Sequence, residues 1–255
     1  MWLPDGGRGA GPYRADQIQA KDPYELSNGH LVECMPTGQR GAKSTTSGAS
    51  LLAADPEVES AGIDAGFSPD AGTLRAPDIS IGGLKDEPGW TTTAPLLAVE
   101  YADTGQNEVS LRQKIIDLLR AGTKYIWVVR LHGPQCVEVH EQDAPVRIMR
   151  IGDILEAPGA LRNPVPVSAF YDQKEAQRLT LRNLLQREGY QGLEDVKLQS
   201  RLLEARNAVR RVLAKRKLPL SAADQARIDT CNNLEILERW LDNAIDAPNA
   251  AHALE

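Results

Sequence analysis

The fold of this chain is decided by two neighbouring stretches, Ala76-Pro77-Asp78-Ile79-Ser80-Ile81 and Pro95-Leu96-Leu97-Ala98-Val99-Glu100-Tyr101. Each stretch has the apolar residues of a buried strand, and each also carries one acidic residue. An isolated carboxylate is strongly disfavoured among apolar side chains unless a cation pairs with it. A divalent metal is one such cation, because hard ions such as Mg²⁺ prefer carboxylate oxygens. These two stretches therefore predict a functional site in which carboxylates are paired with a cation.

A helix and further strands follow these stretches. Residues 108–121 are expected to form a helix that ends before Gly122, since glycine is typical of the position after a helix. Its apolar face carries Leu111, Ile115, Leu118 and Leu119. Lys114 lies at the border of that face, so its stem can follow apolar surface while its ammonium group reaches the sheet. Residues 124–131 are expected to form the next buried strand, and residues 136–140 a half-exposed one.

Each of these polar residues also has a purely structural interpretation. Asp78 could cap a turn after Pro77, and Lys114 could be an ordinary lysine on a solvated helix face. Glu100 is harder to explain in this way, because four apolar residues precede it. Together, two carboxylates and a lysine describe a site for phosphodiester hydrolysis. The carboxylates would hold Mg²⁺, and the lysine would orient the attacking water or stabilise charge on the phosphate.

Several segments, in this order, resemble the Uma-type family of restriction endonucleases in the PD-(D/E)XK nuclease superfamily. They are Tyr24-Glu25-Leu26-Ser27-Asn28-Gly29, Pro77-Asp78, the apolar strand ending in Glu100, the helix carrying Lys114, and residues 122–129. The resemblance implies an α/β (α+β) fold with a mixed sheet of restriction-endonuclease type flanked by helices. It also implies a Mg²⁺-dependent nuclease site, with Mn²⁺ as a possible substitute. Asp78 and Glu100 would be the metal ligands, Lys114 the catalytic lysine and Glu25 a supporting acid.

The sequence departs from the family pattern near Glu100. Ala102 stands where a strict Glu-x-Lys motif has its lysine, so the catalytic lysine would have to come from the helix. Residues 103–105 replace a Ser-Pro pair, and no histidine occurs between His30 and His132. These departures leave open a second function, a catalytically silent relative that binds nucleic acid or partner proteins.

Composition divides the chain into three predicted regions: a flexible N-terminal arm over residues 1–22, the nuclease-like domain over residues 23–168, and a helical extension over residues 169–255. In the extension, glycine and proline become rare, and helical patterns span residues 174–188, 193–215 and 221–246. Residues 193–217 are the most basic stretch. They could form a solvated helical face, a phosphate-contacting surface or an oligomerisation element.

Composition also limits the setting in which the protein acts. The net charge is −6, and 42% of the residues are hydrophobic, which suits a globular protein with at most a local basic surface. The three cysteines are too scattered for a disulfide framework or a zinc motif. No apolar run reaches the length of a membrane helix, about 18 residues. We therefore expect a cytoplasmic protein with no membrane partner. The resemblance to restriction endonucleases implies DNA as its partner, and we expect a homodimer. An assembly adaptor built around the C-terminal helices is a third possibility.

Overall fold

A computed structural model describes residues 11–105 and 107–255 of the chain. Its contacts divide the chain into two compact units, and the boundary between them in the sequence falls between Arg187 and Glu188. The first unit contains a mixed sheet with helices, and the second contains helices alone. Each unit is described by itself below.

The centre of the first unit is a mixed six-stranded sheet, as the sequence predicts. Its strands, in spatial order, are β3 (Ala61–Gly62), β4 (Ile79–Ile81), β5 (Leu97–Ala102), β6 (Tyr125–Arg130), β7 (Cys136–Glu141) and β8 (Arg147–Arg150). The strands β5 and β6 pair in parallel, and every other neighbouring pair in this sheet is antiparallel. The apolar run that precedes Glu100 thus forms an interior strand, covered on both faces.

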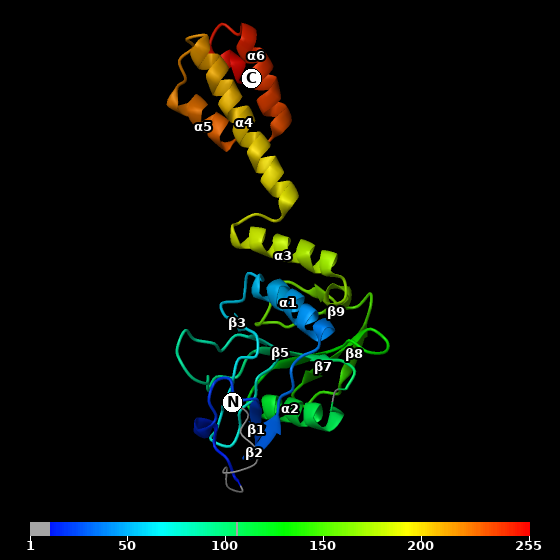
Figure 1. Cartoon of the computed structure of the whole chain (residues 1–255). Coiled ribbons are helices and arrows are strands. Elements are labelled where there is room, and N and C mark those ends of the chain that lie inside the picture. Colours follow the sequence, from blue (N-terminus) through cyan, green and yellow to red (C-terminus); the bar gives the residue numbers. More distant parts are fainter. Residues whose placement is uncertain (1–10, 106) are drawn as a thin grey trace. The chain divides into compact units, whose positions relative to one another are not determined.

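Successive side chains of a strand point to opposite faces, and this places the two halves of the core. Leu97, Val99 and Tyr101 of β5 join the apolar cluster that includes Leu51 and Leu52 of α1 (Gln39–Ala53). The alternate residues Ala98 and Ala102 join a second cluster with the apolar face of α2 (Glu108–Arg120). The helices α1 and α2 accordingly lie on opposite sides of the sheet, as Figure 1 shows. Glu100, between Ala98 and Ala102, belongs to the side of α2.

A separate hairpin supports this side of the molecule. Strands β1 (Tyr24–Ser27) and β2 (His30–Glu33) pair with each other, and Leu26 exchanges two backbone hydrogen bonds of 2.8 Å with Leu74. A single 3₁₀ turn, η1 (Ala15–Gln17), precedes the hairpin, and both Ala15 and Ile18 are buried against Leu26 and Leu74. The predicted arm is therefore packed at Ala15 and Ile18, while most of residues 11–22 are exposed. The arm's first ten residues lie outside the described part of the chain.

The first unit continues past the boundary expected from composition. Two short strands, β9 (Ile154–Leu155) and β10 (Val165–Pro166), lead through a 3₁₀ turn, η2 (Val167–Phe170), into α3 (Gln173–Arg187). Phe170 packs edge-on against Trp127 with ring centroids 6.0 Å apart, and Ala176 is buried in the cluster that covers the sheet. Asn183 donates a hydrogen bond to the carbonyl of Leu51. The division after Arg187, rather than after residue 168, reflects these contacts.

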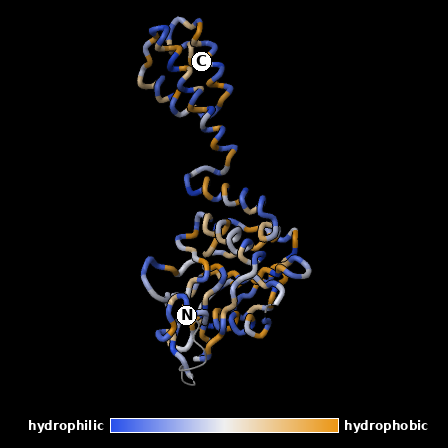
Figure 2. The backbone as a smooth tube through the Cα atoms, in the orientation of Figure 1, coloured by the Kyte–Doolittle hydropathy of each residue, from blue (hydrophilic) through white to orange (hydrophobic). Residues whose placement is uncertain are grey.

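The second unit contains α4 (Leu193–Lys215), α5 (Ala222–Thr230), α6 (Leu234–Asp246) and the short α7 (Ala250–Ala253). Hydrophobic and hydrophilic residues alternate along these helices, as Figure 2 shows, and the hydrophobic ones form the unit's own core. The single helix expected over residues 221–246 is two helices. The chain leaves the helical conformation at Cys231, and the side chain of Asn233 caps α6 by accepting from the amide of Ile236.

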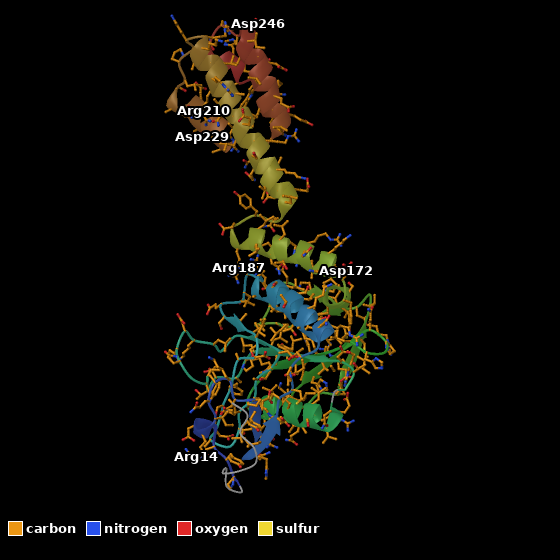
Figure 3. All side chains as sticks on the ribbon, viewed as in Figure 1. Arg14, Asp172, Arg187, Arg210, Asp229 and Asp246 are labelled. Atoms are coloured by element: carbon orange, nitrogen blue, oxygen red, sulfur yellow. The ribbon has the colours of Figure 1, made fainter. Side chains whose placement is uncertain are left out.

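Part of the basic run on α4 is used inside this unit. Arg206 donates to the carbonyl of Cys231, and Arg216 donates to the carbonyls of Ala244 and Ala247 at the end of α6. Arg210 pairs with Asp229 of α5 (Figure 3). These three arginines therefore hold the helices of this unit together. Fewer basic side chains of α4 are then available to contact phosphate groups. No helix among the described residues is long and apolar enough to cross a membrane.

Candidate active site

The structure brings all four predicted site residues together, each from a different segment. Glu25 comes from β1, Asp78 from the residue before β4, Glu100 from β5 and Lys114 from α2. Ile79 of β4 pairs with Val99 of β5. Asp78 comes directly before Ile79, and Glu100 comes directly after Val99. The backbone amide of Tyr101 donates a hydrogen bond of 2.6 Å to Oδ2 of Asp78, which fixes this carboxylate beside the end of β5.

Lys114 is the hub of the cluster. Its Nζ lies 2.9 Å from Oε1 of Glu100 and 3.0 Å from Oε1 of Glu25, and it donates to the carbonyl of Ala76 at 2.8 Å. The side chain is only 14% exposed, as expected for a lysine whose stem follows the apolar face of α2. Burial alone would lower its pKa, but the carboxylates of Glu100, Glu25 and Asp78 outweigh burial and raise it. Lys114 therefore stays charged at neutral pH.

The carboxylates of the site differ in their protonation. Burial, reinforced by the negative charges of Asp78 and Glu25, raises the pKa of Glu100 to about 8 despite the nearby Lys114. Burial also raises the pKa of Asp78. Burial would have the same effect on Glu25, but the charges of Lys114 and Arg75 outweigh it, so the pKa of Glu25 is lowered. Without a further cation, then, Glu100 holds a proton at pH 7 while Glu25 is ionised.

Two charged residues of this region were not predicted from the sequence. Arg75, which is 1% exposed, binds Oε2 of Glu25 and Oδ2 of Asp117, which is 6% exposed. Asp117 lies within the apolar face of α2, between Ile115 and Leu118, and such a charge in a buried stripe was a readable signal. For Arg75 there was no comparable signal, because its partners are 50 and 42 residues away.

The site's donor atoms suit a hard metal ion. Oε1 of Glu100 is buried and, although Nζ of Lys114 is near, it receives no hydrogen bond of suitable geometry from any described residue. Such an unsatisfied carboxylate oxygen is a fitting ligand for Mg²⁺. Among the described residues, no three acidic, histidine or cysteine side chains are placed so that they alone could hold a metal ion. Asp78 and Glu100 would therefore hold an ion together with other oxygen ligands, as Mg²⁺ often keeps waters.

Ala102 shows how the site dispenses with a lysine on the strand. It points to the same face as Glu100, is 3% exposed, and packs against the apolar face of α2. Its small side chain leaves α2 close to the sheet, and from this helix Lys114 reaches Glu100. The mixed sheet, with acidic residues on adjoining strands and a lysine over them, agrees with the restriction-endonuclease type of fold expected from the sequence.

Comparison with known proteins supports this type of fold and narrows it. Residues 13–165 match the model of the Uma2 family, described as "Putative restriction endonuclease", and the chain belongs to this family. Its fold is similar to the crystal structure of "a putative nuclease belonging to DUF820" from Anabaena variabilis, with a TM-score of 0.55 and 17% sequence identity. That likeness covers 64% of this chain and 99% of the other. No curated protein matches the sequence.

These findings confirm the predicted family and fold class. The match ends at residue 165, so it covers the sheet and the whole site but not α3 or the second unit.

Proposed function

We propose that the protein is a Mg²⁺-dependent DNA endonuclease that hydrolyses phosphodiester bonds at the cluster of Asp78, Glu100 and Lys114. Asp78 and Glu100 are its metal ligands, Lys114 its catalytic lysine, and Glu25 its supporting acid. One observation carries the proposal: Nζ of Lys114 lies within 3.0 Å of a carboxylate oxygen of both Glu25 and Glu100. This cluster lies beside Asp78 on one face of the sheet. Mn²⁺ is expected to replace Mg²⁺, since both accept carboxylate oxygens.

The charges around the site favour a divalent ion. Four buried or half-buried carboxylates (Glu25, Asp78, Glu100 and Asp117) face two largely buried cations (Arg75 and Lys114), which leaves two negative charges when all six are ionised. A buried excess of charge is costly, and protonation of Glu100 offsets only half of it. One divalent cation would neutralise both charges with Glu100 ionised, which is the form that binds a metal. When bound, it supplies a Lewis acid for the phosphate.

Neighbouring groups of the chain hold Asp78 and Lys114 in fixed orientations. The amide of Tyr101 holds the carboxylate of Asp78 in place, and Glu25 together with the carbonyl of Ala76 holds the ammonium group of Lys114. A preorganised ammonium group of this kind can donate to a phosphate oxygen as negative charge accumulates there. Because Lys114 is already fixed, little reorganisation is needed when the substrate arrives.

The substrate and assembly complete the proposal. We take double-stranded DNA as the substrate, in keeping with the family's description. The described residues carry one such cluster per chain, and a homodimer would place one cluster at each strand of a duplex, so a homodimer is proposed. Cytoplasmic localisation stays a prediction from the sequence.

Incubation of purified protein with supercoiled plasmid tests the proposal. Nicked and linear products should form with Mg²⁺ or Mn²⁺ and should be absent in EDTA. The variant Asp78→Asn should lose this activity, whereas Asp86→Asn, in an exposed loop, should keep it. Undiminished cleavage in EDTA, or full activity of Asp78→Asn, contradicts the proposal. Binding of DNA without cleavage under either metal would favour the catalytically silent relative.

A further inference from the structure

A buried ion-pair network lies behind the proposed site. Arg75 donates through Nε and Nη2 to Oδ2 of Asp117, at 2.9 and 2.6 Å, and through Nη1 to Oε2 of Glu25 at 2.9 Å. Asp117 also accepts from Ser27 of β1 and from Gln113 of its own helix. Buried ion pairs are weak evidence for stability, because apolar side chains of similar volume often serve as well. Their position beside Lys114 suggests a different purpose.

The two oxygens of Glu25 are divided between two cations. Oε2 is bound by Arg75, while Oε1 faces Lys114 and accepts from the amide of Ala76 at 3.2 Å. The planar guanidinium group offers donors in a fixed fork, so Arg75 restricts the rotation of the Glu25 carboxylate. Oε1 is thereby held toward the ammonium group of Lys114.

The same arginine also fixes the helix that carries Lys114. Asp117 follows Lys114 by three residues on α2, so the two side chains share one helix face. Asp117 is tied to β1 by Ser27 and to the segment before β4 by Arg75. The backbone of Arg75 is itself anchored by two hydrogen bonds to Phe67, of 2.7 and 2.8 Å. These bonds set both the rotation and the distance of α2 relative to the sheet.

We propose that Arg75 and Asp117 are positioning residues that aim Lys114 at the reacting phosphate, an inference that rests on the proposed nuclease function of this site. Arg75 neutralises Asp117 and one side of Glu25, which leaves Lys114 for Glu100 and the substrate. If Arg75 is lost, Asp117 loses its ion-pair partner, and Lys114 lies about one turn away on the same helix. Its ammonium group is then drawn away from Glu100.

Kinetics of Asp117→Asn and Arg75→Lys test the inference, with Asp55→Asn as the matched control. Asp55 is 2% exposed and accepts backbone amides of Arg162 and Asn163, so it is an equally buried structural aspartate. The two test variants should lose about a hundredfold in kcat, the scale of a 1 Å misplacement, with little change in KM for DNA. The control should keep the kcat of the parent. A loss confined to KM, or equal losses in the control, overturns the inference.

A double-mutant cycle separates positioning from general destabilisation. In the Lys114→Met background, Asp117→Asn should cost nothing further in kcat, because the group that it aims is already gone. A purely structural role would instead lower kcat by the same factor in both backgrounds. Equal factors would therefore overturn the inference even if the single variant is impaired.

Chemical modification of Lys114 can test the positioning role even if the parent protein does not cut DNA. Acetylation of lysines by an amine-reactive ester, quantified by mass spectrometry in EDTA, reports the accessibility of Lys114 without any activity. Lys114 should react faster in Asp117→Asn and Arg75→Lys than in the parent or in Asp55→Asn, while the exposed Lys124 reacts equally in all four. An unchanged rate for Lys114 overturns the positioning role. A changed rate in a protein that does not cut DNA supports it and refutes only the proposed function.

Discussion

Replacing Glu100 by glutamine should make the metal-free protein more stable relative to the parent as the pH rises. The pKa of Glu100 is raised by burial to about 8, from an ordinary value of 4.5. A group with a raised pKa contributes stability that is fully present below 4.5 and is lost as the pH rises through 8. Glutamine has nearly the same shape but does not titrate, so the variant escapes this loss.

The size of the effect follows from the shift. One pKa unit corresponds to about 1.4 kcal/mol, and pH 7 lies about 2.5 units above the ordinary pKa of the glutamate. The free energy of unfolding of Glu100→Gln, minus that of the parent, should therefore rise by about 3 kcal/mol between pH 4.5 and 7. The attraction of Lys114 is already contained in the pKa of Glu100, and Lys114 keeps its charge over this range.

Urea unfolding in EDTA at pH 5, 6, 7 and 8 measures this difference. Asp103→Asn is the control, since the hydrogen bond and charge of Arg40 lower the pKa of Asp103. Its contribution is present above the ordinary pKa and is lost only as the pH falls, so that difference should stay flat from pH 5 to 8. Adding Mg²⁺ should stabilise the parent more than Glu100→Gln, because the ion binds the ionised carboxylate. A flat difference for Glu100→Gln as well would refute the reasoning that burial dominates at this residue.

Three further predictions test other parts of the structure. Lys114→Met should still bind Mg²⁺ and DNA but lose on the order of a hundred- to a thousandfold in cleavage rate, measured in single-turnover assays, whereas the exposed Lys124→Met should cut normally. A chain that ends at Arg187 should stay folded, as measured by circular dichroism. A chain that ends at residue 168 should not, because it lacks Phe170 and α3. Equal stability of the two chains would place the domain boundary at residue 168, as composition suggested. Gly48→Ala should lower the free energy of unfolding by about 1–3 kcal/mol, because a new Cβ would lie 2.1 Å from the hydroxyl of Tyr101; an unchanged melting temperature would contradict that packing.

Most of the sheet and the central cluster followed from local sequence patterns. The continuous apolar run before Glu100 indicated an interior strand, and β5 is such a strand. Lys114 at the border of an apolar helix face indicated a lysine that reaches the sheet, and its Nζ contacts Glu100. These predictions held because burial and periodicity within a few residues decide them.

Other features depend on partners that are distant in the sequence. Arg75 could not be recognised as a site residue, since Glu25 and Asp117 reach it only after folding. The boundary after Arg187 was missed for the same reason: α3 has the composition of the later helices but packs on α1. The break between α5 and α6 was readable, because Asn233 is a strong helix-capping residue.

The span of the network around Asp117 also bears on when the proposed nuclease site forms during synthesis of the chain. Glu25 and Arg75 are 50 residues apart, and Ser27 and Asp117 are 90 apart, so both contacts close long loops. Closing such loops costs entropy before any contact rewards it, and contacts of this kind form late in folding. A nascent chain that has not yet released residue 117 from the ribosome has neither the helix of Lys114 complete nor its anchor in place. The proposed nuclease would thus stay inert throughout early synthesis and become competent only with the closing steps of folding.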